Sequence, residues 1–214
     1  MRKRKVITRS GARVRGLFAS LKSERLIPWE SPLEHDALLV NEFDPTVRRM
    51  REFQECLRIG NGDSGFDAYP DFLIEPVDGA PFLLEVKSDF DAADEHVRLR
   101  LNMVAAHLAS ESQRYLVLCE REIRLQPRLG TLETLRTYRR PGAASALSSQ
   151  ADIADLLTEK TSITFAIAAH HLGCRSRVLQ LIANDLLRTN LTRPISDDSV
   201  LTVAPEQPHA YVSR

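Results

Sequence analysis

The stretch YPDFLIEPVDGAPFLLEVK, residues 69–87, decides the fold of this chain. It contains two largely apolar runs, 71–77 and 81–87, which are joined through the dipeptide Asp-Gly. This dipeptide between two strand-like runs is a strong signal for a β-hairpin, because both residue types tolerate the backbone conformations of a tight turn. Strands that are apolar on both faces usually lie buried in a sheet. The stretch therefore predicts a buried antiparallel hairpin.

Three charged residues lie inside this apolar hairpin. A turn centred near residue 78 places Asp71 opposite Glu85, with their Cβ atoms about 4.5–5.5 Å apart. Two carboxylates at that distance repel each other, and a divalent cation that prefers oxygen ligands, such as Mg²⁺ or Mn²⁺, offsets the repulsion. Lys87 shares the strand face of Glu85, where an ammonium can hold a water molecule or a phosphate. The pattern indicates a centre for hydrolysing phosphodiester bonds.

A simpler interpretation of the same residues stays open. Asp71 follows Pro70 and can be an ordinary residue at the edge of a strand, while Glu85 and Lys87 can belong to a solvated face. The apolar neighbours of all three argue against this interpretation, because a buried charge needs a partner or a metal.

The charge of the chain is balanced overall but unevenly distributed. The 214 residues include 29 basic and 29 acidic side chains, and no acidic residue precedes Glu24. We expect residues 1–24 to form a basic arm that binds phosphate, or else a solubilising terminus. The candidate DNA contacts in this arm are Arg2, Lys3, Arg4, Lys5, Arg13 and Arg15.

Several classes of protein are excluded by composition. No apolar run approaches the roughly 20 residues of a membrane span, so we expect no membrane partner. The charged N-terminus has no apolar segment typical of a signal peptide. The three cysteines, Cys56, Cys119 and Cys174, have the spacing of neither a zinc site nor a disulfide framework. A reducing, cytoplasmic location is the expectation.

The order of predicted elements indicates an α/β domain over 25–140. Ser31, Pro32 and Glu34 have the pattern of a helix start, with serine as the cap. Alternating apolar and polar residues favour a strand within 47–59. The predicted elements are a helix over 31–41, a strand within 47–59, the hairpin, a helix over 91–110, a strand over 115–120 and a short helix over 131–140.

A second domain is expected over 151–205, after a linker at 141–150 and before a tail at 206–214. Three segments have helical periodicity, 151–159, 163–173 and 174–188, and two short strands are predicted around the turn SDDS, at 191–195 and 199–203. Three helices with a two-stranded wing describe a winged-helix domain. Arg175 and Arg177 lie early in its candidate recognition helix and are candidate DNA contacts, although such domains also dock proteins.

Several motifs together resemble a known family. Asp71 after proline, followed by Glu85-Val86-Lys87, resembles the PD-(D/E)xK nuclease motif, and the order of elements resembles the restriction-endonuclease fold, a mixed central sheet flanked by helices. More narrowly, four strings resemble the TnsA family, the endonuclease subunit of heteromeric transposases. These strings are WESPLEHDALL at 29–39, NEFDPTV at 41–47, YPDFLIE at 69–75 and LLEVK at 83–87.

The resemblance implies a role for each matched residue. It implies that Glu34, Asp71, Glu85 and the carbonyl of Val86 bind Mg²⁺, for which Mn²⁺ substitutes, and that Lys87 is the catalytic lysine. It also implies cleavage of the 5′ ends of a transposon, beside a DDE transposase that cuts and joins the 3′ ends and an AAA+ ATPase that regulates both. The family associates the C-terminal domain with that ATPase. The chain departs from the family pattern at Glu55, where proline is expected.

Three alternatives stay open. Glu34 can instead complete a capping box by reaching back to the backbone N–H of Ser31. The chain can be a stand-alone repair, resolvase or restriction-type nuclease of the same fold. It can also be a non-catalytic DNA-binding regulator built on the winged helix.

Overall fold

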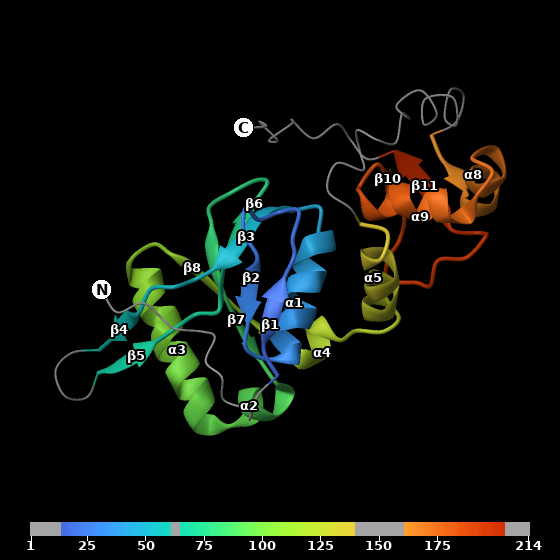
Figure 1. Cartoon of the computed structure of the whole chain (residues 1–214). Helices are drawn as coiled ribbons and strands as arrows, with labels where there is room; N and C mark the ends of the chain where they lie inside the picture. The colour runs from blue at the N-terminus through green and yellow to red at the C-terminus, as the bar shows by residue number, and fades with distance from the viewer. Residues whose placement is uncertain (1–13, 61–64, 140–160, 204–214) are drawn as a thin grey trace. The chain divides into compact units, whose positions relative to one another are not determined.

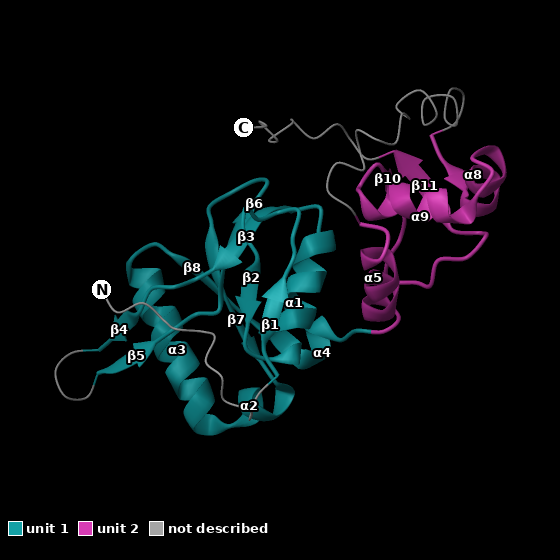
Figure 2. Cartoon of the chain, viewed as in Figure 1, with its two compact units in different colours: residues 1–125 teal, residues 126–214 magenta. Residues whose placement is uncertain are grey.

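The computed structural model describes residues 14–60, 65–139 and 161–203 (Figure 1). The chain divides into two compact units, residues 1–125 and 126–214 (Figure 2). Several predictions fall outside the described residues: the linker at 141–150, the helix at 151–159, the tail at 206–214 and the candidate DNA contacts before residue 14. No helix of the described part is long and apolar enough to cross a membrane.

The first unit is built on a mixed sheet of four strands. These strands lie in the order β3-β6-β7-β8, with the first two pairs antiparallel and the last pair parallel. Their bounds are β3 Val47–Glu52, β6 Phe72–Pro76, β7 Phe82–Lys87 and β8 Arg114–Cys119. The protein is therefore a mixed α/β protein, as the sequence predicts.

The predicted hairpin is confirmed as β6 and β7. Its register pairs Phe72 with Leu84 and Ile74 with Phe82. Continued by one residue, the same register sets Asp71 opposite Glu85. The turn is made possible by Gly79, whose φ of +94° is a conformation that side chains with a Cβ rarely adopt.

Helices cover both faces of this sheet (Figure 1). Leu83 of β7 packs with Val104 and Leu108 of α3, Glu95–Ser110. Because side chains alternate along a strand, Leu84 faces the opposite side, where α1, Pro32–Phe43, contacts β7. Two short helices complete the unit, α2 at Asp89–Ala93 and α4 at Glu120–Ile123.

Helix α1 begins where the sequence predicts. The Oγ of Ser31 accepts a hydrogen bond from the backbone N–H of Glu34 at 3.1 Å, and proline occupies the first turn, where its missing N–H costs nothing. At the other end, the ammonium of Lys22 donates to the carbonyls of Asn41, at 2.9 Å, and Asp44. A cation at this end also complements the helix dipole.

Residues 16–22 do not belong to a separate basic arm. Strand β1, Gly16–Phe18, pairs antiparallel with β2, Ile27–Trp29. After it, the hydroxyl of Ser20 and the backbone N–H of Leu21 donate to the buried carboxylate of Glu42, at 2.5 and 3.0 Å. The segment is therefore attached to the first unit by the β1-β2 pairing, by buried Phe18 and by the hydrogen bonds to Glu42 of α1.

The strand predicted within 47–59 is two strands. Strand β3 ends at Glu52, and Phe53 turns its backbone N–H to the carbonyl of Asp71 at 3.1 Å. Strand β4, Leu57–Ile59, pairs instead with β5, Phe66–Ala68, in a separate two-stranded sheet. This small sheet packs on α3, where Ile59 shares a buried cluster with Val104.

The second unit contains three described helices and a three-stranded antiparallel sheet of order β10-β11-β9. The helices are α5 Arg128–Arg136, α8 Phe165–His171 and α9 Arg175–Ala183, and the strands are β9 Ile163–Thr164, β10 Leu187–Arg188 and β11 Val200–Val203. The strand predicted at 191–195 is wrong, because β11 pairs with Leu187–Arg188 and Ile163–Thr164 instead.

Helix α5 belongs to the second unit, although the sequence pattern predicts a first domain that extends to residue 140. Its buried leucines, Leu129, Leu132 and Leu135, recur at helical spacing on the face that packs within this unit. The side chain of Asn184, at the end of α9, donates to the carbonyl of Tyr138 at 3.3 Å. The boundary between units therefore lies near residue 125 rather than at 140.

The pairing of β1 with β2 depends on a glycine. A Cβ at Gly16 would lie 2.4 Å from one ring carbon of Trp29, closer than real contacts allow. We expect Gly16→Ala to lower the free energy of unfolding by about 1–3 kcal/mol, measured by urea denaturation. A smaller aromatic ring relieves the clash, so the loss in Gly16→Ala/Trp29→Phe should be less than the sum of the two single losses. Simple additivity would contradict the assigned clash.

Candidate active site

A cleft of about 660 Å³ opens in the first unit beside the end of the hairpin. It is bounded by the start of α1, the segment from β5 to β6, the end of β7 and one face of α3. The charged and aromatic residues that line it are Glu30, Glu34, Phe66, Asp67, Tyr69, Asp71, Glu85, Lys87, Asp91, Arg100 and Tyr115.

Asp71 is fixed in the floor of the cleft by three backbone hydrogen bonds. Its N–H donates to the carbonyl of Leu84 at 3.0 Å, and its own carbonyl accepts from Phe53 at 3.1 Å. Its Oδ2 accepts from the backbone N–H of Val86 at 2.8 Å. Only 8% of the residue is exposed, so its carboxylate is oriented by the neighbouring strands rather than by solvent.

Glu85 and Lys87 form an ion pair next to Asp71. Their side chains are 12% and 27% exposed, so the pair is only partly screened by water. Burial by itself would lower the pKa of Lys87, but the negative charges of Glu85, Asp71 and Asp91 and the hydrogen bond to Glu85 together raise it above its ordinary value. Lys87 is therefore a cation at neutral pH.

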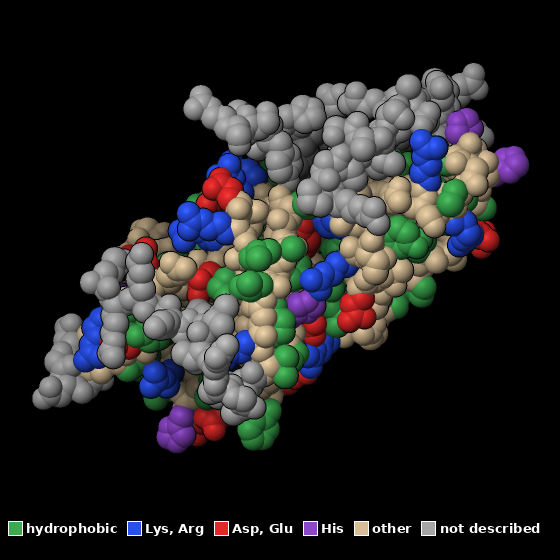
Figure 3. Space-filling view, viewed as in Figure 1, with side chains coloured by type: hydrophobic (Ala, Val, Ile, Leu, Met, Phe, Trp, Pro, Cys, Tyr) green, Lys and Arg blue, Asp and Glu red, His purple; other side chains and the backbone are tan. Residues whose placement is uncertain are grey.

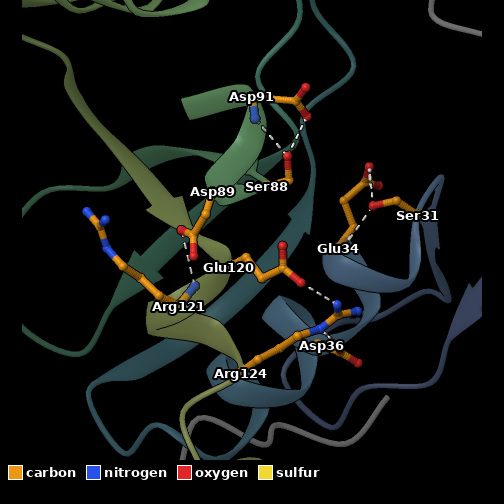
Figure 4. Close-up of polar contacts among 9 residues, drawn as sticks. All are labelled: Ser31, Glu34, Asp36, Ser88, Asp89, Asp91, Glu120, Arg121 and Arg124. Carbon is orange, nitrogen blue, oxygen red and sulfur yellow. Dashed lines mark hydrogen bonds and ion pairs between the residues drawn. The ribbon is translucent and has the colours of Figure 1, made fainter. Parts of the chain in front are cut away.

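Glu34 lies in the first turn of α1, next to Ser31 (Figure 4), and also lines the cleft. Its Oε2 accepts from the backbone N–H of Glu30 at 2.7 Å, and its Oε1 accepts from the hydroxyl of Ser31 at 3.2 Å. These contacts are those of a helix cap, although the N–H that it reaches is that of Glu30 instead of the predicted Ser31. Glu34 thus makes cap contacts while it lines the cleft.

The cleft brings together every residue of the predicted centre. Glu34, Asp71, Glu85, Val86 and Lys87 come from three separate stretches of sequence and all line it. Within the described part of the chain, however, no three His, Cys, Asp or Glu side chains are grouped as a ready metal site. Two of the three expected carboxylates already have partners: Glu34 makes its cap contacts, and Glu85 pairs with Lys87.

The donor types at the hairpin end suit a cation such as Mg²⁺. Asp71, Glu85 and the carbonyl of Val86 are oxygen donors, which this ion prefers, and the described residues that line the cleft include no sulfur or imidazole ligand. Glu34 can complete the set by exchanging its contacts with Glu30 and Ser31. The donor types therefore fit the ion, and Glu34 and Glu85 would bind it in place of, or beside, the contacts that now engage them.

A polar network holds the elements around this end of the cleft (Figure 4). Arg124 donates to Asp36 of α1 at 2.8 Å and to Glu120 of α4 at 2.6 Å. The hydrogen bond to Asp36 is the main cause that raises the pKa of Arg124. Asp89 of α2 accepts from the backbone N–H of Arg121 at 3.4 Å. These contacts connect α4 to both α1 and α2. They therefore hold the first turns of α1, which carry Glu34, in place.

Tyr115 and Arg100 are among the cleft residues that are missing from the predicted set. Tyr115 lies on β8 opposite Leu83, and burial, with the charges of Glu85 and Asp71, raises its pKa. Arg100 lies on α3 with its guanidinium 4.0 Å from the ring centre of Phe66. In the sequence Tyr115 belongs to an apolar strand, and Arg100 is one of several charges beside the apolar stripe of its helix, so neither stands out.

Of the candidate DNA contacts in the first unit, Arg15 is the one that the structure describes, and it does not line this cleft. In the second unit, Arg175 pairs with Asp197 and lies over the ring of Phe165, 4.6 Å from its centre. On the face shown in Figure 3, basic and acidic side chains are interspersed over the described surface. A broad basic face for DNA is not visible in that view.

The fold and the cleft together define a mixed α/β protein with an acidic cleft at the end of a buried hairpin. No protein-family model matches the sequence, and no curated protein matches it either.

The charge state of Lys87 depends on Glu85. Because the pKa of Lys87 in the folded protein is raised above its ordinary value, the charge of Lys87 stabilises the fold at neutral pH, and this stabilisation is lost only as the pH rises through the raised pKa. We expect Glu85→Gln to lower the pKa of Lys87, since burial then acts against fewer negative charges. ¹³C NMR of the reductively dimethylated protein measures it, with Lys87→Arg to assign the signal.

The control for this titration is Asp67→Asn. Asp67 also lines the cleft, but it is not among the groups that shift the pKa of Lys87, so this variant should titrate like the wild type. Equal Lys87 pKa values in Glu85→Gln and wild type would refute the assigned ion pair.

Proposed function

We propose that the chain is a Mg²⁺-dependent DNA endonuclease that cleaves the 5′ ends of a transposon together with a DDE transposase, under an AAA+ ATPase. The observation that carries the proposal is the convergence of Glu34, Asp71, Glu85 and Lys87 on one cleft. These are the residues that match the PD-(D/E)xK motif and the TnsA family in the sequence.

The topology of the first unit supports a restriction-endonuclease-like core. Along the chain, α1 is followed by β3, by the β6-β7 hairpin, by α3 and by β8, and the small β4-β5 sheet is inserted after β3. The parallel pairing of β8 with β7, after the crossover through α3, matches the arrangement expected for that core. The hairpin end that carries Asp71 and Glu85 opens into the cleft.

The chain's own residues have separable tasks in the proposed hydrolysis. Three groups of the hairpin end would hold Mg²⁺ from the sheet: the carboxylates of Asp71 and Glu85 and the carbonyl of Val86. The N–H of Val86 orients the carboxylate of Asp71. Glu34 would hold the ion from α1. When bound, Mg²⁺ supplies Lewis acidity that makes water more acidic and neutralises phosphate charge. Lys87 remains protonated beside Glu85, so it donates to a phosphate oxygen and stabilises the charge that grows there.

A winged helix in the second unit is supported by α8, α9 and the three-stranded sheet, with Gly173 in the turn between the helices at a φ of +70°. We assign this unit to docking the ATPase rather than to reading DNA. The reason is that Arg175 is already engaged by Asp197 and stacked on Phe165, which leaves it poorly placed to enter a groove. Arg177 stays a candidate DNA contact.

Nicking of supercoiled plasmid tests the catalytic assignment. Asp71→Asn keeps an oxygen that accepts from Val86 but removes the negative charge, so we expect the fold to persist and the Mg²⁺-dependent nicking rate to fall by about 10²–10³-fold. Lys87→Ala should have a similar effect. The matched control is Glu75→Gln on β6, the strand that follows Asp71, because the carboxylate of Glu75 pairs with Arg48 outside the cleft. If Asp71→Asn nicks at the wild-type rate, the site is misassigned.

Two variants separate the cap role of Glu34 from its proposed metal role. Ser31→Ala removes the hydroxyl that caps α1 and leaves the carboxylate of Glu34. Glu34→Ala removes that carboxylate and, with it, the contacts to the N–H of Glu30 and the hydroxyl of Ser31. Both should lower stability without metal by about 1 kcal/mol. Bound Mn²⁺ raises the melting temperature by mass action, so Ser31→Ala should retain that rise and Glu34→Ala should lose most of it. An equal Mn²⁺-dependent rise in both variants would restrict Glu34 to the cap.

A further inference from the structure

The cleft is acidic for a site that must accept a polyanion. Six carboxylates line it against two cations, Lys87 and Arg100. The carboxylates are Glu30, Glu34, Asp67, Asp71, Glu85 and Asp91. Lys87 is already paired with Glu85. Among the residues that the structure describes, Arg100 makes no ion pair, so its positive charge is available to a ligand.

Arg100 lies beside the apolar stripe of α3. Val97, Leu101 and Val104 line the cleft at the spacing of one helical face, and Arg100 adjoins this face and also lines the cleft. The residue is exposed, so the arginine adds a positive charge to a lining that also includes the hairpin end.

Phe66 holds the guanidinium of Arg100 in place. The guanidinium carbon lies 4.0 Å from the ring centre, which is a close cation–π contact, and both residues line the cleft. Stacking uses the flat face of the guanidinium and leaves the N–H groups at its edge to donate. Such an edge matches the two oxygens of a phosphate, whereas a lysine would offer only a point charge.

We infer that Arg100 binds a backbone phosphate of the DNA substrate in the cleft that Asp71 and Glu85 also line. The inference rests on the proposed nuclease function, because that function defines the ligand as DNA. A phosphate contact of this kind adds affinity without sequence preference, since every nucleotide carries the same group. Arg100 and Phe66 thereby position the strand, and the hairpin residues act on it.

The chain offers two matched controls. Arg98 is exposed on the same helix, two residues earlier, and does not line the cleft. Arg114 lies over Phe82, 5.4 Å from the ring centre, and also lies outside the cleft lining. Replacing either removes one positive charge, and Arg114 also reproduces the stacking on phenylalanine. If only Arg100→Ala loses DNA affinity, the cause is the position of Arg100 in the cleft and not the change in net charge.

The experiment measures binding, not cleavage. The full chain is titrated with two short fluorescein-labelled DNA duplexes of unrelated sequence in Ca²⁺, and anisotropy is followed over a range of salt concentrations. For Arg100→Ala we expect the affinity to fall about tenfold on both duplexes and the slope of log affinity against log salt to shrink by about one unit. Arg98→Ala and Arg114→Ala should stay within about twofold of the wild type.

Two further variants test the geometry. Arg100→Lys keeps the charge but loses the planar edge, and Phe66→Leu keeps the arginine but loses the ring that holds it. Both should bind with an affinity between those of the wild type and Arg100→Ala. An Arg100→Ala affinity equal to that of Arg98→Ala would overturn the inference and leave the proposed nuclease intact. A wild type that neither binds these duplexes nor nicks plasmid would overturn both.

Discussion

The hydrogen bond from the backbone N–H of Val86 to the carboxylate of Asp71 is the contact on which the site depends. It joins the end of β7 to the residue that precedes β6, at the point where the regular ladder stops. It satisfies a buried N–H that would otherwise lose its partner, and it orients a carboxylate that solvent scarcely reaches. The hydrogen bond that stabilises the hairpin end is therefore also the one that orients the carboxylate of Asp71.

The features that the sequence predicts correctly are those with a local cause. The Asp-Gly turn and the apolar alternation set the hairpin register, and the register alone puts Asp71 opposite Glu85. The cap at Ser31 follows from its spacing to Glu34. Each of these depends on residues close in sequence or on a single turn, so periodicity and turn chemistry suffice to find them.

The features that the sequence misses depend on distant partners. Residues 16–22 are held by hydrogen bonds to Glu42, about twenty positions away in the sequence. The basic composition of the N-terminus does not predict that partner. Helix α5 has the same helical pattern whichever unit it joins, and only its contact with α9 decides the boundary. Arg100 becomes a candidate ligand residue only once β5 brings Phe66 beneath it. Tertiary neighbours override local pattern in all three cases.

Helix α1 is anchored at both ends by groups remote in sequence. Lys22 holds its last carbonyls, and the backbone carbonyl of Lys22 also accepts from Met50 of β3 at 3.1 Å. Arg124 ties Asp36 near its first turn to α4. With the helix axis pinned in this way, a change of partner at Glu34 is a rotation about side-chain bonds, which takes picoseconds to nanoseconds, and the backbone need not travel. The side chain of Glu34 can thus change partners while the backbone of α1 keeps its position.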